Sequence, residues 1–166
     1  MEQKQSHERV AHQGPLSGIR VIDLGTMFAG PFAASLMADF GADVIKVELP
    51  GTGDSHRGMP PVIQGVPGPW TILARNKRCV SLDIRKESGK QILKKLVADA
   101  DIVVENLRPG TLEGWGRGYE VLKEITPALI MVRISGYGQT GPDRYKAGFG
   151  TPATAFGGLT YMQGFP

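Results

Sequence analysis

IRVIDLGTMFAGPFAASLMADFGADVIKVE, residues 19–48, has the pattern of a strand, a tight turn, a helix and a second strand. Its opening IRVIDL is a short apolar, β-branched run of the kind found in strands that are covered on both faces. Pro31 has the backbone angle of a first helical turn, and Gly41 ends the helix. The second strand follows at 44–47. Because a strand–helix–strand unit of this length crosses over right-handed to a parallel neighbour, the stretch predicts an α/β fold.

The helix inside this stretch carries a row of large apolar side chains. Phe32, Leu36, Met37 and Phe40 recur at helical spacing. This spacing predicts one apolar stripe along the helix.

Later segments continue the alternation of strands and helices. The pattern predicts strands at 74–84, 102–104 and 129–134, an amphipathic helix at 86–98 and a short helix at 119–125. Loops rich in glycine and proline separate them, as in α/β sheets. The closing TPATAFGGLTYMQGFP has the start of a helix followed by a loss of pattern. We therefore expect a Rossmann-like, mostly parallel sheet with helices on both faces.

Composition limits the domain organisation and the classes of partner. The 166 residues are 41% hydrophobic, which suits one globular domain. We expect this domain at 15–166, after a polar, disordered arm at 1–14 that lacks the apolar segment of a secretory leader. The formal net charge is +3 with scattered basic residues, which argues against nucleic-acid binding and is compatible with small anionic ligands. No run approaches the ~18 apolar residues of a membrane span.

Cysteine and histidine are few. The single cysteine, Cys79, excludes an internal disulfide and fits a reducing compartment, so we expect a cytoplasmic protein. At a strand start it is interpreted as a small packed residue. No metal-ligand spacing links His7, His12 and His56, and no metal is expected.

The turn after the first strand is the first place to look for a ligand. Ligands of parallel sheets bind at the carboxyl ends of the strands, and N–H groups at the start of a helix favour anions. However, GTMFAG at 25–30 fits neither the dinucleotide fingerprint nor the phosphate loop. A second interpretation is that Gly25 and Gly30 only let the helix pack closely on the sheet.

Three further polar groups each allow two interpretations. In the long loop after residue 48, His56 and Arg57 are either a solvated loop tip or contacts to a phosphate-bearing ligand. The basic cluster 75–78 either binds an anion or keeps a strand edge soluble. Glu105 and Asn106 end a strand at a carboxyl tip, where a polar pair could reach a ligand.

Five segments resemble, in order, the N-terminal part of class III CoA-transferases, the group of the formyl-CoA and carnitine CoA-transferases and the related acyl-CoA racemases. They are PLSGIRVIDLG, AGPFAASLMADFGADVIKVE, NKRCVSLDI, IVVENLRPG and ISGYGQTGP. The resemblance implies a Rossmann-like domain plus a smaller second domain, of which this chain would supply only the first part. It also implies a homodimer, or a heteromer with a related subunit.

The resemblance further implies coenzyme A, or an acyl-CoA, as substrate, together with a small carboxylic acid. Carried over by motif, Met27, Phe28 and Ala29 would contact the pantetheine or thioester. Lys77 of NKR would lie near the adenosine, and Asn106 follows from ENLRPG.

The catalytic residue of the family does not carry over. Transferases of this family attack the thioester with an aspartate, forming a mixed anhydride and then an enzyme thioester. In GFGTPATA that position is Gly150. Three hypotheses follow: a non-catalytic subunit that pairs with an aspartate-bearing relative, an active variant that uses Asp143, or a protein that only binds CoA thioesters. An acyl-CoA racemase-like enzyme and a structural or interaction domain without a small ligand are the further alternatives.

Overall fold

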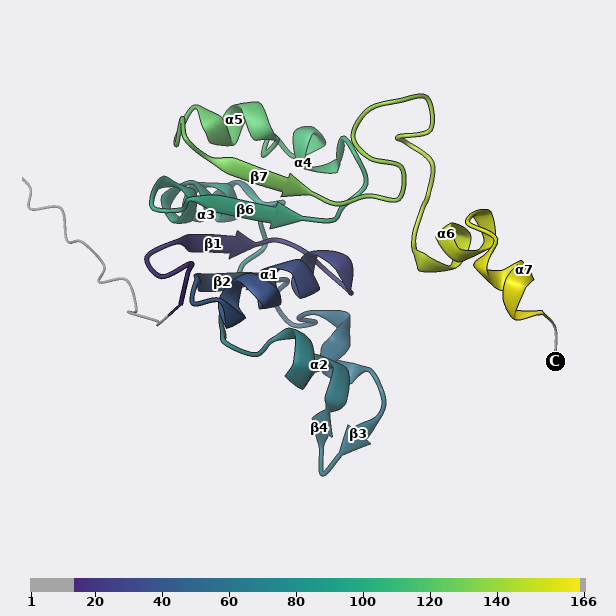
Figure 1. Ribbon diagram of the computed structural model, residues 1–166. Helices are drawn as coiled ribbons and strands as arrows, with labels where there is room; N and C mark the ends of the chain where they lie inside the picture. The colour runs from purple at the N-terminus through teal and green to yellow at the C-terminus, as the bar shows by residue number, and fades with distance from the viewer. Residues whose placement is uncertain (1–13, 165–166) are drawn as a thin grey trace, which may run out of the picture.

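The computed structural model describes residues 14–164, so the expected arm falls almost entirely outside the described residues. Its main sheet has five parallel strands in the order β5-β2-β1-β6-β7 (Figure 1). The strands are β1 (Arg20–Asp23), β2 (Asp43–Glu48), β5 (Lys77–Ser81), β6 (Ile102–Glu105) and β7 (Ile130–Arg133). After β1 the chain adds β2 and then β5 on one side of β1. It then adds β6 and β7 on the other side. The strand order therefore reverses between β1 and β6, which is where open α/β sheets bind ligands.

Helices cover both faces of this sheet, as expected. Successive residues of a strand point to opposite faces, and the two cores follow from this rule. Val21 belongs to the core beneath α1 (Ala29–Asp39), whereas Ile22 belongs to the core on the other face. That second core also holds residues of α3 (Glu87–Ala98), α4 (Thr111–Gly114) and α5 (Tyr119–Lys123). The predicted parallel α/β fold is confirmed.

Of the four residues predicted to form the apolar stripe, Met37 packs partly buried against the core beneath α1, whereas the other three face away from the sheet. Phe32, Leu36 and Phe40 are 48%, 41% and 55% exposed, whereas Ala34 and Ala38 are buried against the strands. Small side chains let the helix approach the sheet closely, and the large ones are then left on the outer face.

The long segment between β2 and β5 is not one aperiodic loop. It contains η1 (Ser55–Gly58), an antiparallel hairpin of β3 (Val62–Ile63) and β4 (Val66–Pro67), and α2 (Gly68–Leu73). In Figure 1 the hairpin projects from the body of the domain. The strands are two residues long, too short to show as periodicity in the sequence.

Two short helices end the described chain. α6 (Gly150–Phe156) and α7 (Leu159–Gln163) pack on each other and lie apart from the sheet (Figure 1). The expected loss of pattern is a break at Gly158, whose φ of 76° is left-handed, and a second helix follows it. Cys79 is exposed rather than packed, because β5 is an edge strand. Within residues 14–164, no helix has both the length and the apolar character needed to span a membrane.

Candidate functional site at the switch point of the sheet

Asn106 joins the two loops that leave the sheet at the switch point. Its Oδ1 accepts a hydrogen bond from the Thr26 N–H at 2.8 Å, and its Nδ2 donates to the Thr26 carbonyl at 2.7 Å. The β1–α1 turn and the end of β6 are thus clamped to each other. Both polar atoms of the Asn106 amide are hydrogen-bonded to Thr26, and contact with CoA stays a prediction.

The glycines of the β1–α1 turn are required by close packing. A Cβ on Gly25 would lie 2.9 Å from Gly30 Cα, and a Cβ on Gly30 would lie 3.0 Å from Asn106 Oδ1. The packing interpretation of this turn is therefore confirmed. It does not exclude a ligand, because the residues between the two glycines reach the surface.

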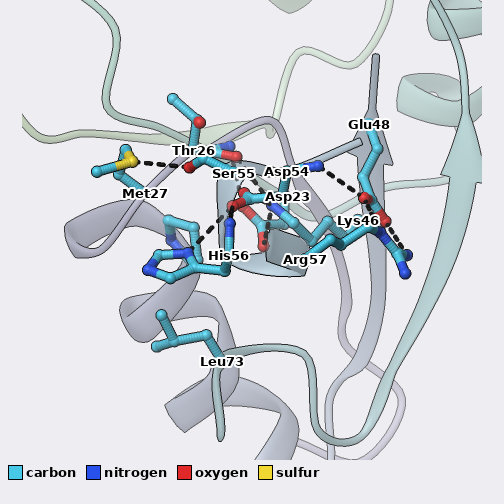
Figure 2. Close-up of polar contacts among 12 residues, drawn as sticks. Asp23, Thr26, Met27, Lys46, Glu48, Asp54, Ser55, His56, Arg57 and Leu73 are labelled. Carbon is cyan, nitrogen blue, oxygen red and sulfur yellow. Dashed lines mark hydrogen bonds and ion pairs between the residues drawn. The ribbon is translucent and has the colours of Figure 1, made fainter. Parts of the chain in front are cut away.

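Met27 and Phe28 present apolar side chains at this turn, with exposed fractions of 41% and 53%. Met27 has a φ of 60°, an uncommon conformation for a residue with a side chain. Its sulfur accepts a hydrogen bond from the Ser55 hydroxyl at 2.7 Å (Figure 2). Ala29, the first residue of α1, is exposed next to them. The turn predicted to meet pantetheine is thus open at the surface, and the contact itself stays a prediction.

A cleft of about 280 Å³ opens beside this turn, at the carboxyl ends of β1, β2 and β5. Its lining includes Gly25 and Thr26 after β1, the segment 82–85 after β5, and Trp115 after α4. None of the predicted contact residues lines this cleft; they are Met27, Phe28, Ala29, Lys77 and Asn106. The sequence analysis missed 82–85, although the rule that ligands bind at carboxyl strand ends applies equally to β5.

Lys77 is not at an exposed strand entrance. Its Nζ lies 2.8 Å from Asp23 Oδ2 and donates to the Pro31 carbonyl at 2.6 Å, and its side chain is fully buried. Burial lowers the pKa of Lys77, while the Asp23 carboxylate opposes that shift. A position beside the adenosine stays a prediction, but the ammonium group already has two partners.

The neighbouring cations are paired as well. Arg75 pairs with Asp39, and Arg78 contacts both oxygens of Asp43 at 2.7 Å. Each basic residue of the 75–78 cluster that was considered as an anion site thus has an aspartate from another element as partner. These ion pairs hold the cluster against the sheet and α1, and binding of an anion by it stays a prediction.

A chain of buried charges lies beneath the turn, and the sequence analysis missed it. Lys46, 1% exposed, donates to the Gly25 carbonyl at 2.9 Å and lies 3.0 Å from Asp54 Oδ2 and 3.8 Å from Asp23 Oδ2. Asp54 in turn contacts His56 Nδ1 at 3.0 Å (Figure 2). A lysine within a strand that is covered on both faces was the available signal, because a buried ammonium needs carboxylate partners.

His56 is buried, whereas the Arg57 side chain is 44% exposed and ion-paired. His56 is 0% exposed, and Arg57 donates to both oxygens of Glu48 at 2.7 Å while lying over the Trp70 ring. Burial raises the pKa of Glu48, but the Arg57 guanidinium and the Asp54 N–H outweigh this and lower it to about 2. The solvated interpretation of His56 is therefore wrong, whereas contact with a phosphate-bearing ligand stays a prediction.

The carboxylate of Glu105 also has partners within the protein. It is 1% exposed, pairs with Arg133 at 2.8 Å and accepts a hydrogen bond from the Leu107 N–H. Its carboxylate holds the end of β6 rather than reaching outward. Residues 14–164 contain no group of three or more His, Cys, Asp or Glu side chains arranged to hold a metal ion.

Comparison with known proteins places the chain in a family. The model of CoA-transferase family III matches residues 16–166. The chain belongs to CoA-transferase family III. Among solved structures, a CAIB/BAIF family protein from Brucella suis superposes with a TM-score of 0.82 at 39% identity, over 88% of this chain and 40% of that one.

Several curated relatives in Chloroflexus aurantiacus are about half identical to this family member. Succinyl-CoA–D-citramalate CoA-transferase is 51% identical over 158 residues, which is 92% of this chain and 38% of the relative. The alpha subunit of succinyl-CoA–L-malate CoA-transferase is 50% identical over 93% of this chain, and the beta subunit is 50% identical over 92%. The chain spans 36–38% of the length of these three relatives.

The position of the family aspartate, as the sequence resemblance assigns it, is the first residue of α6. An added Cβ on Gly150 would meet no atom within 4 Å, so a larger side chain fits there. Asp143, the alternative carboxylate, pairs with Lys146 at 2.8 Å, and its side chain is 45% exposed. It has the setting of a solvated turn residue between Pro142 and Arg144.

Proposed function

We propose that this chain binds CoA thioesters at the switch point of its sheet and takes part in moving CoA between an acyl-CoA and a carboxylic acid. The observation that carries the proposal is the match to relatives named as CoA-transferases, at 50–51% identity over more than nine-tenths of the chain. Residues 15–166 would act as a Rossmann-like CoA-binding domain within the larger enzyme fold. We propose a cytoplasmic location for it.

The exposed β1–α1 turn supports the proposal that the pantetheine and thioester bind there. Met27, Phe28 and Ala29 offer an apolar surface at the start of α1, beside a cleft at the carboxyl ends of three strands. In this proposal Asn106 and Lys77 serve the same site by holding the turn, because both contact its backbone or the residues that flank it.

Catalysis needs a carboxylate that this chain lacks at Gly150. We propose that the chain pairs with a related subunit that supplies the nucleophilic aspartate. Alpha and beta subunits among the named relatives support this arrangement over a homodimer. Native mass spectrometry of the protein as purified from its own cells tests it. A complex with a related longer chain is expected, and a homodimer or a monomer would contradict it.

Binding of CoA to the purified chain tests the first half of the proposal. Isothermal titration with CoA should give saturable binding. A ligand at a hundredfold excess over its Kd should raise the free energy of unfolding by about 2.7 kcal/mol. The absence of both heat and stabilisation would overturn the proposal and favour a domain without a small ligand.

A matched pair of variants locates the binding on the turn. Phe28→Ala removes an exposed ring at the start of α1, whereas Phe40→Ala removes an equally exposed ring at its far end. CoA affinity should fall roughly tenfold in Phe28→Ala, as for the loss of about 1.4 kcal/mol of apolar contact. It should be unchanged in Phe40→Ala, and equal losses in both would count against the mapped site.

A further inference from the structure

The imidazole of His56 is buried beside the candidate site, and the proposed function gives it no role. It is 0% exposed, and its ring lies edge-on to Phe28 with centroids 4.5 Å apart. Asp54 Oδ1 lies 3.0 Å from His56 Nδ1 and also accepts the backbone N–H of His56 at 3.0 Å. The ring orientation is therefore set by one carboxylate oxygen that holds both the ring and its backbone.

This carboxylate determines which ring nitrogen carries the proton. Burial raises the pKa of Asp54, but the His56 N–H and the Lys46 ammonium outweigh it, and the net shift is downward. Because an ionised carboxylate only accepts, Nδ1 of the neutral ring carries the hydrogen and Nε2 carries a lone pair. The charged groups around this pair include Lys46, Asp23 and Lys77 on one side and the Glu48–Arg57 ion pair, which accepts the Asp54 N–H, on the other.

Nε2 is buried and has no hydrogen-bond partner within residues 14–164. Buried acceptors are nearly always satisfied, so one that is not requires an explanation. A neutral imidazole that a carboxylate orients through Nδ1 is the arrangement by which proteins present Nε2 as a proton acceptor.

The turn predicted to meet pantetheine lies directly over this imidazole. Phe28, half exposed, has its ring against His56, and the hydroxyl of Ser55, the neighbour of His56, holds the Met27 sulfur. Figure 2 shows Met27, Ser55 and His56 close together at the edge of the buried charges. The Phe28 ring is thus the cover between the imidazole and the surface.

We propose that the Asp54–His56 pair accepts the proton of the CoA thiol at His56 Nε2, when the Phe28 ring turns aside. This inference rests on the proposed function. The S–H bond breaks and an N–H bond forms at Nε2, which leaves a thiolate beside an imidazolium that Asp54 stabilises. In the reverse direction a departing CoA thiolate takes the same proton back. Because the thiolate is the nucleophilic form of a thiol, the pair would hold free CoA ready to accept an acyl group.

Thiolate absorbance in the ultraviolet tests this step on the purified chain. An imidazole that takes the thiol proton lowers the apparent pKa of the thiol, so a larger fraction is thiolate at a given pH. We expect the thiolate fraction of bound CoA at pH 7 to exceed that of free CoA at the same pH severalfold. Desulfo-CoA, which lacks the sulfur, serves as the matched ligand and should bind without giving the band.

Two variants separate the proton acceptor from the fold. His56→Asn keeps an amide where Nδ1 meets Asp54, and His56→Gln places an amide where Nε2 lies; neither can accept a proton at neutral pH. Both are compared with the parent chain at saturating CoA, so that a change of affinity does not enter the comparison. Both should lose the thiolate band.

A second measurement needs no substitution. In the chain labelled with ¹⁵N-histidine, the Nε2 resonance of His56 should move from the lone-pair to the protonated position on addition of CoA, and not on addition of desulfo-CoA. An unchanged resonance with CoA bound would overturn the inference even if both variants fail to fold.

The outcomes separate the inference from the proposed function. Binding of CoA and desulfo-CoA without a thiolate band overturns the role of His56 and leaves CoA binding intact. A band that persists in both variants also overturns it, because another group then takes the proton. Failure of both ligands to bind overturns the proposed function, and the inference with it.

Discussion

Replacing Lys77 with methionine should destabilise the domain, because the ammonium of Lys77 is the close partner of a fully buried carboxylate. Asp23 is 0% exposed, and its Oδ2 lies 2.8 Å from Lys77 Nζ. Removing one member of a buried pair costs roughly 3–5 kcal/mol. Asp23 would retain the Gly25 N–H at 2.9 Å and Lys46 at 3.8 Å. We therefore expect the lower end, a loss of about 3 kcal/mol in the free energy of unfolding.

Urea unfolding followed by circular dichroism measures this loss. Lys95→Met, an exposed lysine on α3, is the control and should change the free energy of unfolding by less than about 0.5 kcal/mol. In the double variant Asp23→Asn/Lys77→Met the buried charge is removed together with its partner. It should recover a substantial part of the loss, because residues in contact are not additive.

The outcome that refutes this reasoning is a Lys77→Met domain as stable as the Lys95→Met control. It would mean that Lys77 is solvated and that its ammonium is available to a ligand, as the sequence pattern suggested. A double variant that is less stable than Lys77→Met alone would refute the account in another way, by showing that Asp23 is not left uncompensated.

Three further predictions concern the turn and its neighbours. Asn106→Asp should cost about 1–3 kcal/mol of stability, because one carboxylate oxygen would face the Thr26 carbonyl that the amide now donates to, and thermal unfolding measures it. Gly30→Ala should cost roughly 1–3 kcal/mol in the same assay, because its Cβ would lie 3.0 Å from backbone and from the Asn106 amide. The pKa of Glu48 is lowered from 4.5 to about 2, so its stabilising effect is present above pH 4.5 and is lost as the pH falls toward 2. Urea titrations across this window should show a loss of roughly 3 kcal/mol that shrinks in Arg57→Gln.

The strands of the main sheet could be predicted from the sequence, because β1, β2, β6 and β7 contain short apolar runs and β5 lies in an alternating segment. The orientation of α1 could not. Phe32, Leu36 and Phe40 have the helical spacing of a core stripe, yet Ala34 and Ala38 are the residues that meet the sheet. Hydrophobic periodicity shows that a helix has an apolar face. It does not show that small residues on the opposite face can pack more closely against the sheet.

The turn at 25–30 could be located from topology alone, because carboxyl strand ends converge at a switch point. The pairing of charges could not be found in this way. Lys77 meets Asp23, which lies 54 residues away, and Lys46 meets Asp54 across a loop with no periodicity. From the local sequence, a basic cluster or a lone histidine is expected to be solvated. Whether it is buried depends on partners that are distant in the sequence.

A CoA titration followed by amide chemical shifts in the ¹⁵N-labelled chain tests the central claim most directly. If CoA binds at the switch point, the largest shifts should fall on the turn 25–29 and on the cleft residues 82–85 and Trp115. The amino ends of the strands, at Arg20 and Asp43, should remain unchanged. Saturable shifts confined to those amino ends, or no shifts at all, would contradict the account.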